Sequence, residues 1–256
     1  MKDTNPKKVA STKDGGKMKS LLLLAAIVAL AGAATTDRAE HMFFNRHLNR
    51  TWLDSAYNML AQLHNAAPKD QHLLYLWPRV HIQKGDDART KDDKLAYFGR
   101  AKAIAETLVA VNDKSDEGHC WWGVAQGRIG QTRGVLNSLF MVPGLKRAFA
   151  RALDLNPKHP TALDAFGVLY YELPGFAGGD LYVSEKYFKR SIESDPGYTL
   201  ARLDLAKVYI KEKRWFAART QLNALLATND PTYPADAELD DKPEARELLK
   251  QIEGKE

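Results

Sequence analysis

The sequence predicts an all-α protein built from stacked helical hairpins. No segment alternates apolar and polar residues with a period of two over a useful length, whereas apolar residues recur at helical spacing along most of the chain. Signals that stop a helix also recur, at intervals of 45, 44, 39 and 34 residues from one stop to the next. Such a recurring spacing is typical of a repeat array. The stops are Pro68, Asp113, Pro157, Pro196 and Asp230.

The first residues have the features of an export leader. Lys17 and Lys19 precede the apolar run 21–30, and Ala31-Gly32-Ala33 supplies the small residues of a cleavage site. We therefore expect residues 1–33 to be a polar extension plus a signal peptide cleaved near Ala33, with the mature protein exported to the periplasm. The alternative is an uncleaved leader, which would then be the only membrane attachment. The polar character of residues 1–17 also leaves Met18 open as the true start.

The leader carries most of the net charge. The formal charge of the chain is +5, and residues 1–33 contribute +4 of it from six lysines and two aspartates, which leaves about +1 for residues 34–256. A nearly neutral body lacks the basic surface that follows a phosphate backbone, so no nucleic-acid partner is expected. Cys120 is the only cysteine, so no internal disulfide is expected. Its place in a helical pattern beside Trp121 predicts a small buried residue.

The first half of the body is predicted to contain three helices. Residues 37–65 form the first and residues 73–82 the second, which Pro78 should kink or restart. Residues 85–93 have the turn chemistry of a solvated loop. Residues 95–111 form the third helix, with an apolar face of Phe98, Ala101, Ile104, Ala105 and Leu108.

The second half continues the same pattern. A helix capped within residues 112–116 runs to Gly130, and an unusually apolar insert occupies residues 131–144. Helices are then expected over 145–155, 161–173, 184–192, 200–210 and 215–227. An acidic loop after Pro234 precedes a last helix over 243–252. The whole repeat domain is placed at residues 37–253.

Residues at repeated places resemble the tetratricopeptide repeat, whose period is 34 residues. One unit presents large, small and aromatic residues in the family's positions, and the units before and after it match in part. Small residues let neighbouring helices approach, and stacking gives each hairpin the core that it lacks alone. The matching residues are Leu163, Phe166, Gly167, Tyr170, Ser184, Phe188, Ser191 and Pro196; then Leu205, Ala206, Tyr209, Ala218 and Leu222; and, upstream, Trp122, Gly123, Phe149, Ala152 and Pro157.

A narrower resemblance covers pieces between Glu117 and Leu226. The segments 119–127, 147–157, 167–179 and 205–209 resemble a subgroup that contains the T-component of tripartite periplasmic transporters and the eukaryotic regulators of microtubule dynamics. This resemblance implies a helical protein that acts by binding and has no catalytic activity. The transporter members are commonly lipoproteins, and this chain has no cysteine after its apolar run.

The residues that repeat arrays use for binding lie on the concave face and in inserts. Three inserts, at 85–93, 131–144 and 173–180, fall between the two helices of a hairpin, where they should project from one edge. The exposed faces of the first helices should line the concave side, where Arg128, Lys207 and Lys211 would grip a carboxylate or an acidic peptide. The predicted concave set is Arg128, Asp164, Tyr171, Glu172, Lys207 and Lys211.

Each remaining motif has a structural interpretation beside its functional one. The insert residues Val135, Leu136, Leu139, Phe140 and Met141 would line an apolar cavity, touch a membrane, or form a short extra helix packed on the stack. The glycine-rich segment 173–180 lacks the strand and the Lys of a nucleotide loop, so Asp180 is expected to cap a helix. His119 beside Cys120 has no second ligand pair at metal spacing, so neither metal nor cofactor is expected.

No pattern of catalytic residues is present, and the chain is expected not to be an enzyme. The sequence favours an exported helical-repeat scaffold that binds a protein or peptide, as an accessory to envelope transport or assembly. The alternative is a carrier whose inserts enclose an apolar small molecule and which works beside a transporter.

Overall fold

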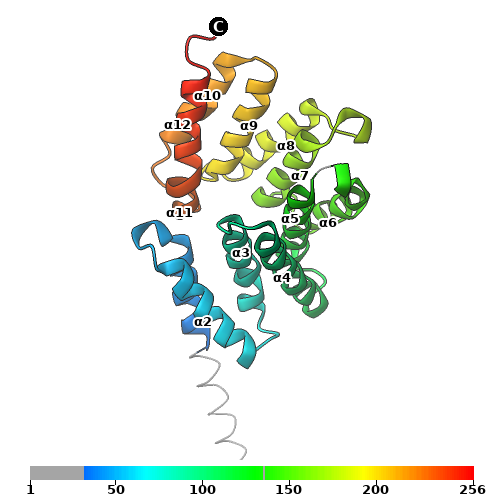
Figure 1. Ribbon diagram of the computed structural model, residues 1–256, viewed down its shortest axis with the longest axis vertical. Helices are drawn as coiled ribbons and strands as arrows, with labels where there is room; N and C mark the ends of the chain where they lie inside the picture. Colours follow the sequence, from blue (N-terminus) through cyan, green and yellow to red (C-terminus); the bar gives the residue numbers. More distant parts are fainter. Residues whose placement is uncertain (1–31, 135) are drawn as a thin grey trace, which may run out of the picture.

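The computed structural model describes residues 32–134 and 136–256, and these are mainly helical with no strand. A helix over residues 32–44 and the 3₁₀ turn η1 (Arg46–Leu48) lead into α2 (Trp52–Ala66). Four hairpins follow, and Figure 1 shows them stacked side by side along the chain. They pair α3 (Gln71–Asp86) with α4 (Lys91–Val111), α5 (Asp116–Arg133) with α6 (Val142–Leu155), α7 (Pro160–Glu172) with α8 (Leu181–Ser194), and α9 (Thr199–Lys211) with α10 (Trp215–Leu226).

The same close contact holds three of these hairpins together. A Cβ atom on Gly85, Gly123 or Gly167 would lie within 2.4 to 2.7 Å of a phenylalanine ring on the second helix of the same hairpin. Glycine is therefore required for the two helices to approach, and the opposing ring fills the space. The rings belong to Phe98, Phe149 and Phe188. These pairs confirm the predicted stack of helical hairpins.

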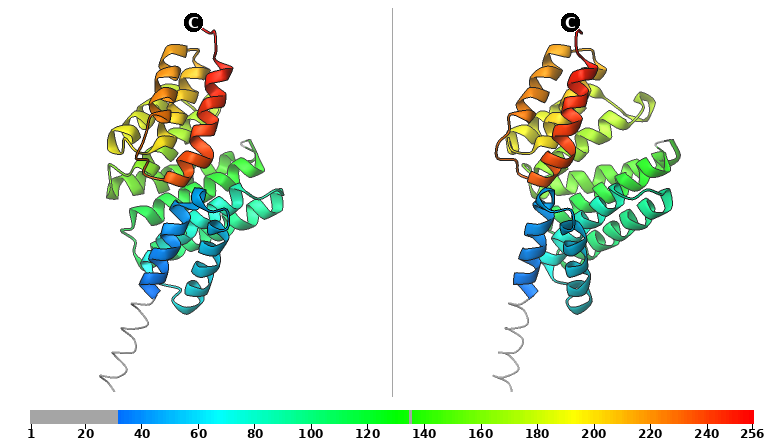
Figure 2. Two further views of the ribbon diagram at one scale, coloured as in Figure 1. Left: turned by 90° about the vertical axis from the view of Figure 1, so that its left-hand side faces the viewer. Right: turned by 60° about the vertical axis from the view of Figure 1, so that its left-hand side comes forward.

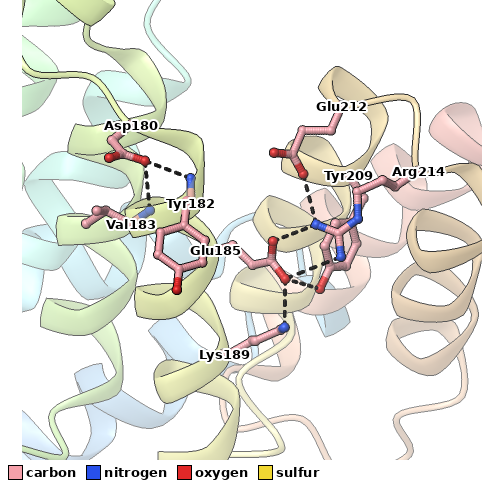
Figure 3. A network of polar contacts seen from close by, with 8 residues as sticks. All are labelled: Asp180, Tyr182, Val183, Glu185, Lys189, Tyr209, Glu212 and Arg214. Carbon is pink, nitrogen blue, oxygen red and sulfur yellow. Dashed lines mark hydrogen bonds and ion pairs between the residues drawn. The ribbon is translucent and has the colours of Figure 1, made fainter.

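The glycine-rich connector between α7 and α8 is a shaped turn. It contains the 3₁₀ turn η3 (Gly175–Ala177) and Gly178 at a φ of 90°. A side chain on Gly179 would meet the carbonyl oxygen of Leu173 at 1.8 Å. Asp180 ends the connector as the predicted N-cap of α8, because its carboxylate accepts hydrogen bonds from the amides of Tyr182 and Val183 at 2.9 and 3.1 Å, as Figure 3 shows.

An ion network around the buried Glu185 joins α8 to α9 and to the turn that leads into α10. Glu185, 7% exposed, accepts hydrogen bonds from the Tyr209 hydroxyl at 3.0 Å and the Arg214 guanidinium at 2.6 Å. Lys189 adds an ion pair at 2.7 Å (Figure 3). Burial alone would raise the pKa of Glu185, but the donors from Arg214, Lys189 and Tyr209 outweigh it and lower the pKa to about 2.

Several predicted boundaries are wrong in the first half of the chain. The single helix 37–65 is two helices, 32–44 and α2, separated where Asn49 accepts a bond from the Thr51 amide at 2.9 Å and so forms a turn. Pro78 does not restart a helix, since α3 runs through it. The loop at 85–93 reduces to residues 87–90, because Gly85 belongs to α3 and Thr90 caps α4.

The extra residues of the early repeats mostly lengthen helices. Helix α4 has 21 residues and α5 has 18, whereas α7 and α9 have 13 each. The insert at 131–144 starts inside α5 and continues as the 3₁₀ turn η2 (Leu136–Met141) before α6 begins. The projecting loops that the repeat spacing predicted are therefore confined to η2 and the connector with η3.

The C-terminal segment is helical over a longer range than predicted. Helical turns begin at Pro234 with α11 (Pro234–Asp236), continue through the π-helical turn η4 (Ala237–Asp241), and pass directly into α12 (Lys242–Gln251). The expected acidic loop is thus mainly helix. Pro234 occupies the first turn, where its missing N–H costs nothing. Figure 2 shows this segment lying along the last hairpin and reaching back toward the N-terminal helices.

Candidate functional site

Contacts between the two ends of the chain close the stack into a ring. The Arg46 guanidinium lies 2.6 Å from the Asp236 carboxylate and also donates to the Gln83 side chain at 2.8 Å. The Phe44 and Tyr233 rings stack at 5.3 Å. We call Phe44, Arg46, Tyr233 and Asp236 the clasp. Both Figure 1 and Figure 2 show the two segments meeting beside α3.

The ring encloses a cavity of about 610 Å³ on the inner side of the stack. Its walls come from α3, α5, α7 and α9, the first helices of the four hairpins, together with Phe43 and the segment from Tyr233 to Glu244. A volume of this size is typical of sites that bury a ligand or a peptide side chain. The concave face therefore lies where the repeat pattern placed it, and the C-terminal helix converts it into a pocket.

Five of the six predicted concave residues line this cavity, namely Arg128, Asp164, Tyr171, Glu172 and Lys207. The sixth, Lys211, is exposed and lies beside the same wall, where it donates to the Tyr171 carbonyl at 3.3 Å and sits 4.4 Å from the centre of the Tyr171 ring. The structure thus brings the predicted set together. The role of these residues in binding stays a prediction.

Two of the three cations predicted to grip a carboxylate already pair with acids of the protein. Arg128 pairs with Asp86 at 3.2 Å, and Lys207 lies 3.0 Å from both Asp204 and Glu244. The third, Lys211, contacts the Tyr171 carbonyl and ring instead. Spacing along single helices could not reveal these ion pairs, because Asp86 and Glu244 lie far from their partners in the sequence. Asp204 is the exception, since it is three residues before Lys207 and on the same face.

Acidic groups outnumber basic ones around the cavity. Among the described residues, nine carboxylates line it against three cations, and Arg46 of the clasp adds a fourth cation that pairs with Asp236, so the acids remain in excess. Those with exposed side chains mark the mouth, and the others lie deeper. The exposed ones are Asp86, Asp87, Glu172, Asp240 and Glu244, the deeper ones Asp164, Asp204, Asp236 and Asp241, and the cations Arg79, Arg128 and Lys207.

Asp164 is the most isolated of the deep acids. It is 3% exposed, and its Oδ1 has no hydrogen-bond partner among the residues that the structure describes. Burial raises its pKa well above the usual value, and the nearby Asp204 and Asp241 raise it further, against weaker opposing effects of Lys207 and Arg128. Asp204 has Lys207 as a direct partner, yet burial still raises its pKa.

Asp241 is the third deep acid, placed by the π-helical turn η4. Its Oδ2 accepts a hydrogen bond from the Thr199 hydroxyl at 2.6 Å, and the side chain is 4% exposed. Burial raises the pKa of Asp241 to about 7, although the Thr199 bond opposes the shift. Sequence reasoning missed this residue because the segment that carries it was expected to be a loop.

A cation already sits against aromatic rings in the wall of the cavity. The Arg79 side chain is 4% exposed, and its guanidinium carbon lies 4.3 Å from the centre of the Tyr233 ring, 4.6 Å from Phe44 and 4.9 Å from Trp121. Its Nη1 also donates to the Tyr75 hydroxyl at 2.8 Å. The faces of aromatic rings stabilise a buried cation. The rings therefore stabilise the Arg79 guanidinium, which has no ion pair to any described carboxylate.

The apolar insert divides between the core and the surface. Met141 is buried and lines the cavity, and Leu139 packs partly buried against the α6–α7 core. Leu136 and Phe140 point outward, with exposed fractions of 68% and 74%. Val135 lies outside the described residues. The insert thus forms the short helical turn η2, and of the five predicted apolar residues Met141 is the one that lines the cavity within the described part of the chain.

The histidine and cysteine candidates have structural roles. The His119 ring is 3.0 Å from the Asp113 carbonyl oxygen, and Cys120 is fully buried, which raises the pKa of its thiol. A different group, Asp37, Glu40 and His72, has its side-chain oxygens and nitrogen within 4.8 Å of one another at the surface. Sequence spacing missed this group because His72 comes from another helix. Exposed groups of this kind are common without a metal.

Most of the predicted leader, residues 1–31, lies outside the described part of the chain, which begins with the helix at 32–44. Among the described helices, none is both long enough and apolar enough to span a membrane.

Repeated helical hairpins with a glycine–phenylalanine contact and a lined concave face define a tetratricopeptide-repeat protein. The tetratricopeptide-repeat profile matches residues 179–237. The profile of the family "Regulator of microtubule dynamics protein 1-3" matches residues 39–175, over half of the chain, and the chain belongs to this family. Membership confirms the narrower resemblance that the sequence suggested.

Individual relatives agree with this assignment. Regulator of microtubule dynamics protein 1 of Bos taurus is 24% identical over 216 residues, a match that covers 77% of this chain and 66% of the relative. The human protein of the same name is 26% identical over 178 residues, covering 62% and 55%. The chain therefore spans between about half and two thirds of these relatives.

One solved structure supports the fold. A thermophilic tetratricopeptide-repeat protein of Thermus thermophilus superimposes with a TM-score of 0.63 at 17% identity, and the match covers 83% of this chain and 99% of that one. Identity at this level indicates shared architecture only.

Proposed function

We propose that this chain is a non-catalytic, exported scaffold that binds an extended segment of a partner protein in its ring-enclosed cavity, as an accessory to envelope transport or assembly. The observation that carries the proposal is the cavity itself. The first helices of four successive hairpins and the C-terminal segment converge on one space of about 610 Å³. Tetratricopeptide repeats bind protein or peptide partners, and a lined concave face suits an extended segment.

The carboxylates of the lining favour a peptide over an apolar small molecule, the other occupant that the sequence suggested. Burying carboxylates against an apolar ligand would leave them without partners, which is costly. A peptide offers amide hydrogens and charged side chains that can satisfy such groups.

Filling the cavity should test the proposal. Gly127 on α5 lines the cavity, and a Cβ atom there would have nothing within 4 Å. Gly127→Phe should therefore occupy the space without disturbing the helix. Gly99 on α4 has the same free surroundings but is not among the described lining residues, so Gly99→Phe is the matched control.

The measurement is retention of random nonapeptides by the protein through size exclusion, read by mass spectrometry. The wild type and Gly99→Phe should retain peptides, and Gly127→Phe should lose at least about tenfold of that retention, which is about 1.4 kcal/mol of binding free energy. Equal retention by all three proteins would place binding elsewhere. No retention by any of them would contradict the scaffold function.

The export component has its own test. Sequencing the N-terminus of the protein purified from the envelope of its own host should find a chain that begins just after Ala33. A protein recovered with its leader intact from the cytosolic fraction would show the export proposal to be wrong.

A further inference from the structure

Resting on the proposed function, a second question is which chemistry the cavity recognises. We propose that it takes the cationic side chain of a lysine or arginine carried by the bound segment, and that the Asp164 carboxylate is the counter-ion for that side chain. Four observations support this assignment: the charge balance, the isolation of Asp164, the exposed carboxylates of the same lining, and the way this protein already holds a buried cation.

The charge balance sets the sign of the ligand. The described lining has nine carboxylates against its three cations and Arg46. Because Arg46, Arg128 and Lys207 are already paired with acids, an acidic segment would meet repulsion that these cations do not offset. A basic side chain would be attracted by the same carboxylates. Charge complementarity of this kind selects partners more than it adds affinity, because a wrong charge costs several kcal/mol.

Asp164 marks the point in the cavity where a cation is needed. Glu244 and Asp204 both share Lys207, and Asp241 accepts from the Thr199 hydroxyl. Asp164 is 3% exposed with Oδ1 unbonded to any described residue, although it faces a cavity large enough for a side chain. A buried carboxylate without a partner is destabilising, and such groups are kept mainly at functional sites.

Exposed carboxylates line the cavity together with Asp164. Glu172 ends α7, the helix that carries Asp164, and Glu244 lies in the first turn of α12, paired with Lys207 at 3.0 Å. Asp86 ends α3, and Asp87 caps it. A mouth lined by one sign of charge concentrates ligands of the other sign and speeds their association.

Aromatic side chains complete the chemistry of a cation site. Tyr171, Tyr198 and Tyr233 line the same cavity as Asp164. Arg79 shows that a guanidinium is stable in this wall with its face toward Tyr233 at 4.3 Å. A second cation from a bound segment would meet rings of the same type beside a carboxylate, a combination that recognises ammonium and guanidinium groups.

Binding a cation at Asp164 also has a consequence for protons. Its carboxyl group, on α7, is faced by Asp204 and Lys207 from α9, by Asp241 from η4 and by Arg128 from α5, and its pKa is raised mainly by burial. A cationic side chain favours the ionised carboxylate, so binding should release a proton from this acid cluster. Affinity for a basic peptide should accordingly increase with pH, until the acids are ionised in the free protein.

The experiment uses three libraries of acetylated, amidated nonapeptides with random flanks and one fixed central residue: lysine, norleucine or glutamate. Norleucine keeps the apolar stem of lysine and removes the charge, so the pair isolates the cation. Retention is measured as for the cavity-filling test, on the wild type, on Asp164→Asn and on Asp154→Asn. Asp154 is an exposed acid on α6 and serves as the matched control.

The wild type and Asp154→Asn should retain the lysine-centred library at least about tenfold better than the norleucine library, and the glutamate library least. Asp164→Asn should abolish the lysine preference and keep the norleucine retention, which also shows that the variant is folded. Calorimetry of a retained lysine peptide in two buffers of different ionisation enthalpy should detect proton release in the wild type and none in Asp164→Asn.

The outcomes separate this inference from the function on which it rests. Equal retention of lysine and norleucine libraries that still depends on an open Gly127 would overturn the cation site and leave the scaffold intact. Absence of retention of every library would contradict the scaffold itself. Spermidine binding that depends on Asp164, with no peptide retained, would assign the cation to a free polyamine and overturn the peptide as its source.

Discussion

Glu185 and Asp164 are two buried carboxylates on neighbouring helices with opposite surroundings. Glu185 on α8 is 7% exposed and receives bonds or ion pairs from Tyr209, Arg214 and Lys189 (Figure 3). Asp164 on α7 is 3% exposed, and its Oδ1 has no bonded partner among the described residues. The first pKa is lowered and the second raised. Both acids are buried, so burial does not explain the difference. Hydrogen-bond donors around the carboxylate determine whether the acid stabilises or destabilises the fold.

The largest loss of stability is expected at Glu185, the acid with several donors. Glu185→Gln should lower the free energy of unfolding by about 2 kcal/mol at pH 7, because the buried carboxylate loses its charge-assisted bonds to Arg214 and Lys189. Urea denaturation followed by circular dichroism measures it. Tyr209→Phe removes a single donor to Glu185 and should cost about 1 kcal/mol.

The pH dependence of the Glu185 effect distinguishes charge from packing. A glutamate in an unfolded chain ionises near pH 4.3, whereas Glu185 ionises at about 2 in the folded protein. Its stabilisation is therefore complete above about pH 4.3 and is lost as pH falls toward 2. The difference between wild type and Glu185→Gln should shrink over that range. A difference that stays constant with pH would show that packing, and not the ion network, is responsible.

The opposite sign is expected beside the cavity. Asp241 ionises near pH 3.9 when unfolded but only at about 7 when folded. The folded protein thus binds the extra proton between these values, and stability falls as pH rises from about 4 to about 7. Asp241→Asn keeps an acceptor for Thr199 and removes the charge, so it should stabilise the protein at pH 8 by about 1–3 kcal/mol.

The gain from Asp241→Asn should vanish below about pH 3, where the acid is protonated in both the folded and the unfolded state. Thermal unfolding at a series of pH values would show it. A variant less stable than the wild type at pH 8 would mean that ionised Asp241 has partners that lower its pKa in solution. The contrast between acids with donors and acids beside the cavity would then be wrong.

The sequence predicted those features that depend on contacts near in the chain. Gly167 and Phe188 belong to one hairpin, so their repeat positions identified both residues, and Asp180 was identified as a cap from its local context. Gly85 was missed although it makes the same contact with Phe98, because Gly-Asp-Asp has the chemistry of a turn. Packing of Gly85 against Phe98 of α4 keeps it in helix α3, although the local sequence indicates a turn.

The candidate site was predicted only in part, because its key contacts are long-range. The concave side chains of α5, α7 and α9 followed from helical periodicity. The clasp joins Arg46 to Asp236, across almost the whole described chain, and it draws an acidic segment into helical order that local composition did not suggest. Because the sequence analysis did not place residues 236–244 at the concave face, it left out their acids. The predicted face therefore had a basic binding cluster, whereas acids are in excess around the cavity.

The most direct test of this account is a carboxyl NMR titration of Asp164, with ¹³C-labelled aspartate and the Asp164→Asn spectrum to assign its signal. The account predicts an ionisation well above the usual range in the free protein, and a fall toward that range when a retained lysine-centred nonapeptide is bound. Two results would contradict the claim that Asp164 is the counter-ion of a bound cationic side chain. One is an ordinary aspartate pKa for Asp164 in the free protein, and the other is a raised pKa that the bound peptide does not change.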